Sequence, residues 1–288
     1  VQMVNVTGGA DSFFAFRGWL FGGILAVLVA LVIIGGIRSI AKVTSRLVPF
    51  MAILYLLTAF IVIGANYADV PWAVYTIMSN AFSPEGISGG VIAVLILGFR
   101  RAAFSNEAGI GSSSIAHAAV KTKEPISQGY VAMLEPFLDT VVVCATTALL
   151  ITVTVYEPGM VNDGTISGVE LTSSAFASVI PWFPYVLAVV IMLFAYSTMI
   201  SWSYYGLEGC IYIFGANRWT KIVYNTIFCL FVVLGCTTQL GAVLDFADSM
   251  IFAMALANVL GLYLLAPVVK RELEAYWSRL RIRYPDAR

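Results

Sequence analysis

The sequence is poor in charged residues and in residues that bind transition metals. Charged residues make up 11% of the 288, against about 25% in soluble domains, and one histidine accompanies four cysteines. The cysteines lack the spacing of a metal site and lie in or beside apolar runs, so we expect free thiols. They are Cys144, Cys210, Cys229 and Cys236. These scarcities exclude an ordinary soluble domain and argue against a bound metal cluster.

Signatures of enzymes are also absent. The sequence has no G-x-S-x-G, H-E-x-x-H or P-loop motif, and the single G-I-G at Gly109–Gly111 is too short for a nucleotide fingerprint. Basic and acidic residues balance at 16 each, which gives no sign of a nucleic-acid partner. We therefore expect a protein that is not an enzyme and has no cofactor of its own.

Hydrophobic residues, in contrast, make up 60% of the chain, and the mean hydropathy is +0.91. Because a spanning helix needs roughly 20 apolar residues, the predicted fold class is an all-α polytopic membrane protein with one membrane domain over residues 1–288. The predicted spans lie at about 19–37, 47–66, 89–119 (broken), 130–155, 182–206, 222–237 and 250–269. Short helices are predicted near 70–82 and 173–179, and the basic tail is expected on the anionic leaflet or as a solvated helix.

Lysine and arginine are missing from every second connection between these spans. The connections at about 67–88, 156–181 and 238–249 contain neither residue, whereas the others and the tail hold every basic residue except Arg17. Arg100 and Arg101 are counted here in the connection after the third span. The positive-inside rule then places the start of the chain outside and its C-terminus in the cytoplasm, in the cell's inner or plasma membrane.

The chain is organised around the stretch 98–119, which reads GFRRAAFSNEAGIGSSSIAHAA. The apolar run before it, 87–97, is too short to cross a bilayer, and helix is expected to resume at Ile115. A glycine- and serine-rich break inside a membrane segment is expected where the backbone lines a cavity, since every polar backbone group needs a partner. The alternative is that the span ends at Phe99 and a cytoplasmic loop follows.

Two carboxylates open the fourth span. Glu135 and Asp139 are four residues apart and so share a helix face, with Pro136 between them. They predict either the wall of an ion pathway, or a clamp against Arg100 or Arg101, or a salt bridge that seals the cytoplasmic end of the bundle.

Other polar residues are given plainer interpretations. Asp245 and Asp248 are interpreted as outside-facing charges at the start of the last span, and Asn258 inside it as a packing position. His117, just past the break, is interpreted as structural rather than as a proton relay.

Hydroxyl side chains recur in the fifth span, within FAYSTMISWSYYGLEG. Ser197 and Thr198 lie side by side at mid-span, and Ser201, Trp202 and Tyr205 follow at helical spacing. Hydroxyl oxygens are hard ligands that suit a cation such as sodium, and Trp202 can shape a small pocket. The alternative is that these hydroxyls serve helix–helix packing, which is common in membranes.

Four segments closely resemble the alanine/glycine:cation (sodium:alanine) symporter family. They are 32–55, 104–119, 123–151 and 196–206, and the resemblance covers essentially the whole chain. It implies a leucine-transporter-type fold of two inverted five-helix repeats, of which this chain holds helices four to ten. Residues 18–66 would then end the first repeat, 87–269 would form the second, and 270–288 would be the cytoplasmic tail.

The resemblance also implies a function and a site. The function is sodium-coupled symport of alanine, glycine or a similarly small amino acid, with sodium as the coupling ion. The implied substrate-binding residues are Phe99, Phe104, Ser105, Asn106, Thr198 and Trp202, and the implied sodium ligands are the hydroxyls of Ser197 and Thr198. The half-helix that follows Gly109 would direct partial positive charge toward a carboxylate.

One departure from the family pattern opens an alternative. The family's first helix, with its own glycine-rich break, has no match in this sequence, and the chain opens with Val1. The alternative function is thus a truncated, non-transporting membrane fragment, or a docking subunit that needs an N-terminal partner. On this interpretation these residues expressed alone would insert without transporting, and adding the N-terminal helices would restore uptake.

Overall fold

The computed structural model describes residues 11–81, 91–156, 168–238 and 240–283. All of its regular elements in these ranges are helical, which confirms the predicted all-α class. Among the described residues, four helices are long and apolar enough to cross a membrane: Gly36–Ala65, Pro125–Thr154, Phe183–Phe214 and Phe246–Ile282. They coincide with the second, fourth, fifth and seventh predicted spans, and the segment Gly18–Ile33 is a shorter apolar helix. The count of seven spans stays a prediction.

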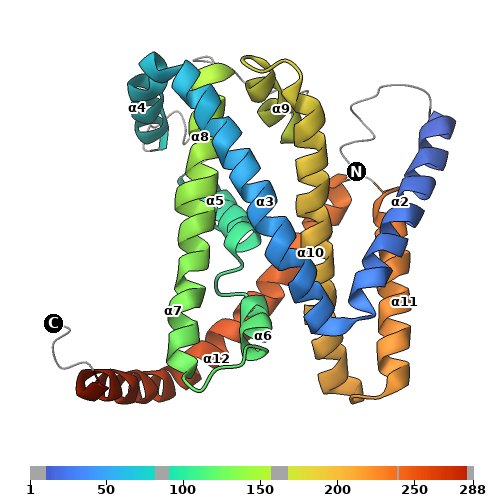
Figure 1. Ribbon diagram of the computed structural model, residues 1–288, viewed down its shortest axis with the longest axis vertical. Helices are drawn as coiled ribbons and strands as arrows, with labels where there is room; N and C mark the ends of the chain where they lie inside the picture. Colours follow the sequence, from blue (N-terminus) through green and yellow to red (C-terminus); the bar gives the residue numbers. More distant parts are fainter. Residues whose placement is uncertain (1–10, 82–90, 157–167, 239, 284–288) are drawn as a thin grey trace. The chain divides into compact units, whose positions relative to one another are not determined.

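The chain divides into two compact units, Val1–Ser88 with Val143–Val243, and Gly89–Val142 with Leu244–Arg288. The first unit contains α2 (Asp11–Ile33), α3 (Gly36–Ala65), η1 (Tyr67–Asp69), α4 (Val70–Ala81), α8 (Ala145–Thr154), α9 (Val169–Ala177), α10 (Phe183–Phe214) and α11 (Arg218–Gly235) (Figure 1). Its short helices α4 and α9 fall where the sequence predicts them.

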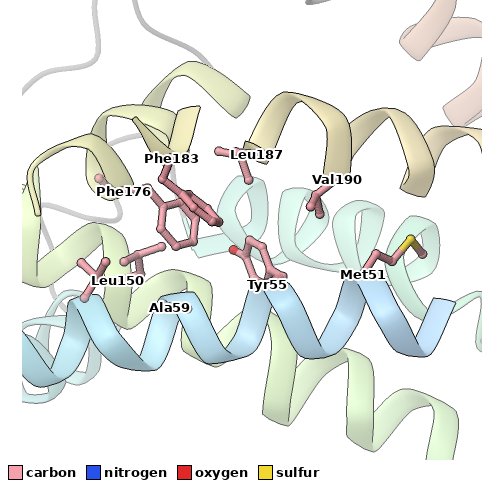
Figure 2. Close-up of a cluster of buried hydrophobic side chains, with 10 residues drawn as sticks. Met51, Tyr55, Ala59, Leu150, Phe176, Phe183, Leu187 and Val190 are labelled. Carbon is pink, nitrogen blue, oxygen red and sulfur yellow. The ribbon is translucent and has the colours of Figure 1, made fainter. Parts of the chain in front are cut away.

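The largest core of the first unit lies where α3, α8, α9 and α10 meet (Figure 2). The rings of Phe176 and Phe183 lie with centroids 4.6 Å apart, and Tyr55 meets Phe176 edge-on at 5.6 Å. The Tyr55 hydroxyl also lies 2.6 Å from Oγ1 of Thr147. Because Thr147 donates its own proton to the carbonyl of Val143, it accepts the proton of Tyr55. This buried phenol is therefore satisfied without water.

A second contact region of this unit joins α2 to α11. Gly22 allows the close approach, since a Cβ there would come within 3.0 Å of Cα of Val233. The turn from α2 to α3 needs a glycine for a different reason, because Gly36 has φ +65°. Helix α2 thus ends at Ile33, before the predicted end of the first span at Ile37.

The second unit contains α5 (Val91–Asn106), α6 (Ser112–Ala118), α7 (Pro125–Pro136) and most of η2 (Phe137–Cys144) and α12 (Leu240–Arg283). Helix α12 continues through Pro267, so the basic tail is not a separate helix. The tail contacts α7 and the residue before it: Nε1 of Trp277 donates to the hydroxyl of Tyr130 at 3.0 Å, and Arg279 forms an ion pair with Glu124 at 2.7 Å. These two contacts hold the tail against the start of α7.

Candidate functional site

The helix break lies in the second unit, between α5 and α6. Three of its residues have left-handed backbone: Glu107 with φ 54°, Gly109 with φ 84° and Gly111 with φ 93°. The side chain of Asn106 begins the turn, because its Oδ1 accepts the backbone N–H of Ala108 at 2.9 Å. Helix α5 runs on to Asn106. The alternative prediction, in which the helix ends at Phe99 and a loop follows, is therefore wrong.

Helix resumes at Ser112, three residues earlier than predicted. Ser112 is fully buried, and its hydroxyl donates to a carboxylate oxygen of Glu107 at 2.5 Å. The hydroxyl of Ser114 donates to the carbonyl of Gly111 at 2.6 Å. Side chains of the stretch thus satisfy part of the interrupted backbone, and the carboxylate of Glu107 already lies at the first residue of α6, where the sequence predicted that a ligand carboxylate would bind.

Asn258 of α12 reaches into the break. Its Nδ2 donates to the carbonyl of Gly109 at 2.9 Å, and a Cβ on Gly111 would come within 2.9 Å of its Cγ and Oδ1. The side chain therefore binds one interrupted carbonyl and fills the space left by a missing side chain. The sequence analysis interpreted Asn258 only as a packing position. The one signal that could have revealed more is an amide in the middle of an apolar helix, where it needs a partner.

Among the predicted site residues at the end of α5, the two polar side chains form hydrogen bonds and the two aromatic side chains differ in exposure. Ser105 donates to a carboxylate oxygen of Asp139 at 2.5 Å, and Nδ2 of Asn106 donates to Oγ1 of Thr140 at 3.2 Å. Phe104 is half-buried, whereas Phe99 is 68% exposed. The structure thus brings Ser105 and Asn106 into one polar cluster with the carboxylate and hydroxyl of η2.

That cluster depends on a change of helix type. Residues Phe137–Cys144 form a π-helix directly after Pro136, and such wide turns recur at functional sites. The predicted clamp between this region and the arginines is wrong: Asp139 accepts from Ser105, and Glu135 lies 3.9 Å from Nε2 of His117. Arg100 and Arg101 both lie close to another carboxylate, that of Asp248.

Arg100 forms an ion pair with Asp248 of α12. Asp248 is 3% exposed, and Nη2 of Arg101 lies 4.0 Å from the same carboxylate oxygen, Oδ2. The prediction of an outside-facing charge at Asp248 is therefore wrong, because the carboxylate is buried between helices. Since both arginines lie inside α5, they also do not belong to the connection in which the sequence analysis counted them.

The predicted sodium ligands lie on α10, in the first unit. The hydroxyls of Ser197 and Thr198 both donate to the carbonyl of Phe194, at 2.8 and 3.0 Å. Ser197 is buried and Thr198 is exposed. A hydroxyl that donates within its own helix keeps oxygen lone pairs for another partner, so both side chains have the chemistry that a hard cation needs.

Trp202, one turn further along α10, is half-buried and packs edge-on against Tyr205, with ring centroids 5.8 Å apart. The predicted site residues thus fall into two groups. Ser197, Thr198 and Trp202 belong to the first unit, and Phe99, Phe104, Ser105 and Asn106 belong to the second.

Several curated transport proteins are similar in sequence to this chain. The chain is 38% identical over 279 residues to the sodium/alanine symporter AgcS of Methanococcus maripaludis, covering 96% of the chain and 60% of the relative. It is 33% identical over 278 residues to the amino-acid carrier protein AlsT of Bacillus subtilis, covering 96% and 58%. It is 32% identical over 280 residues to the probable sodium/glutamine symporter GlnT of the same organism, covering 96% and 57%.

The chain therefore spans about three fifths of the length of the curated relatives it matches. The sequence model of the sodium:alanine symporter family matches residues 1–285. This match fits the apolar helices and the broken helix, and with it the chain belongs to the sodium:alanine symporter family.

Proposed function

We propose that this protein is a secondary active transporter that carries alanine, or a similarly small amino acid such as glycine, together with sodium. The observation that carries the proposal is the family match over residues 1–285, with a sodium/alanine symporter among the relatives. The described structure supports it with the helix break, because a transporter exposes backbone groups to its substrate at such a discontinuity.

The proposed architecture is the leucine-transporter type, with 18–66 as the end of one repeat and 87–269 as the second. The chain would begin outside and end in the cytoplasm of a cell's inner membrane. This orientation is supported by the absence of Lys and Arg from every second predicted connection. Membrane-impermeant thiol labelling in a background without the native cysteines tests this: a cysteine at Lys123 should react from the cytoplasmic side and one at Thr172 from outside. The reverse pattern would exclude the orientation.

The proposed amino-acid contacts in the second unit are Phe99, Phe104, Ser105 and Asn106. Support comes from the polar cluster, in which Ser105 and Asn106 hold the end of α5 through Asp139 and Thr140. Asn106→Ala removes both its bond to Thr140 and its turn bond to Ala108. We therefore expect a higher KM for alanine, with sodium dependence retained. Trp202→Phe, on α10, tests the aromatic contact of the other unit in the same assay.

The proposed sodium ligands are the hydroxyl oxygens of Ser197 and Thr198. Removing one hard oxygen ligand should raise the sodium concentration for half-maximal uptake about tenfold, which corresponds to roughly 1.4 kcal/mol. The test is Thr198→Ala, with Thr198→Ser as the matched control that keeps the oxygen. If Thr198→Ala leaves the sodium dependence unchanged while uptake persists, Thr198 is a packing residue.

Coupling follows from linkage. If bound sodium stabilises the substrate-ready conformation, sodium must raise the affinity for alanine and alanine must raise the affinity for sodium by the same factor. The decisive experiment measures radiolabelled alanine uptake by the protein in proteoliposomes under an inward sodium gradient. Accumulation that stops when potassium replaces sodium supports the proposal. Accumulation without sodium, or none in a correctly folded preparation, refutes it.

A further inference from the structure

The first unit contains a cavity of about 1080 Å³ between α2, α10 and α11. Its size exceeds that of most small-molecule sites, which span roughly 300–1,000 Å³. Small residues on α2 account for the space, since Gly23, Ala26 and Ala30 follow one another on one helix face. A Cβ on Gly23 would meet no atom within 4 Å. The cavity is thus a real gap in the packing, and it is partly open.

One end of this cavity is basic. Arg38 follows the turn from α2 to α3, and Arg218 and Lys221 open α11 after the turn from α10 (Figure 1). Glu208 is the one carboxylate among the described residues of the lining, so their charge sums to plus two. None of the three cations forms an ion pair with a carboxylate in the described ranges. All three lie in the first turns of α3 and α11, at the ends of these helices that the sequence analysis predicted to be cytoplasmic.

The rest of the lining is mostly apolar, and its polar side chains are those of Tyr204, Asn225 and Thr226. Ile33, Leu230 and Val233 are typical of it. Asn225 is among the polar residues, but its Oδ1 is buried and has no hydrogen-bond partner among the described residues. A ligand with hydrocarbon chains and a negative charge at one end matches the basic end and the apolar lining.

We propose that this cavity binds an anionic phospholipid of the cytoplasmic leaflet. The phosphate lies between Arg218, Lys221 and Arg38, and an acyl chain fills the space beside Gly23. Basic pockets between membrane helices on the cytoplasmic side bind anionic headgroups by this chemistry. The inference does not depend on the transported substrate.

The test is native mass spectrometry of the purified protein in detergent, titrated with phosphatidylglycerol or with phosphatidylcholine of the same acyl chains. Phosphatidylglycerol should bind more tightly. The double variant Arg218→Gln/Lys221→Gln should weaken its binding roughly 25-fold, at about fivefold for each basic residue. Lys42→Gln/Arg46→Gln is the matched control, because it removes the same charge from α3 outside the cavity and should leave the affinity within about twofold.

A second variant tests the apolar part of the site. Gly23→Leu fills open space, so the protein should fold, and binding of both lipids should be lost together. Several results would each overturn the proposal: equal affinity for the two lipids, wild-type affinity in Arg218→Gln/Lys221→Gln, or displacement of the lipid by soluble glycerol phosphate. A spectrum of lipid-free dimers would overturn it as well, because a second copy would then cover the cavity.

Discussion

Removing one partner of the Arg100–Asp248 pair should destabilise the protein strongly. Arg100→Gln removes the nearer of two cations from a carboxylate that is 3% exposed, and Oδ1 of Asp248 already has no hydrogen-bond partner among the described residues. Breaking a buried ion pair in this way costs about 3–5 kcal/mol. Because the arginine side chain is 30% exposed, water relieves part of the cost, and we expect a loss near the lower limit, about 3 kcal/mol.

Thermal unfolding in detergent, followed by tryptophan fluorescence, measures this loss. For a chain of this length the unfolding entropy corresponds to roughly 0.6 kcal/mol per degree, so Tm should fall by about 5 °C. Asp248→Asn should act in the same direction, and the double variant should be more stable than the two single losses predict when added. Glu272→Gln, an exposed change on the same helix, should leave Tm unchanged. Additive losses in the cycle would refute the buried pair.

Two further substitutions, one in each unit, test contacts inside the structure. Gly111→Ala should lower Tm by several degrees and reduce uptake, because the new Cβ would lie 2.9 Å from Asn258 and φ is +93°; Gly98→Ala, where a Cβ meets open space within α5, should do neither. Tyr55→Phe should cost about 1 kcal/mol, seen as a smaller fall in Tm, because it removes the 2.6 Å bond to Thr147 but keeps the ring in the core. No change in Tm for Gly111→Ala or Tyr55→Phe would contradict the described contact.

The features that the sequence predicted are those with a local cause. The break was visible because glycines and serines follow an apolar run too short to span, and backbone groups in hydrocarbon need partners. The long apolar helices were visible because each contains a continuous stretch of mostly apolar residues that is long enough to span a bilayer. The hydroxyl pair of Ser197 and Thr198 was also visible, and both hydroxyls donate to the carbonyl of Phe194.

What the sequence missed depends on contacts between residues far apart in the chain. Asn258 meets Gly109, and Asp248 meets Arg100, each across more than a hundred residues. Helical periodicity shows which face a residue occupies but not which helix lies opposite. The π-helix after Pro136 was missed for a related reason, since proline predicts a freed carbonyl but not the wider turn that the surrounding contacts select.

The polar contacts of Asn258 and Asp248 also constrain the axial position of the apolar part of α12. Between Ile251 and Gly261 this helix carries no hydrogen-bonding side chain except Asn258, and an apolar surface fits its neighbours almost equally well after a slip of one turn, about 5.4 Å. Such a slip would leave Gly109 without its donor and Asp248 without its arginine. One amide and one carboxylate, about 15 Å apart along the axis, thus specify a single register for the helix, as a lone polar residue does in a coiled coil.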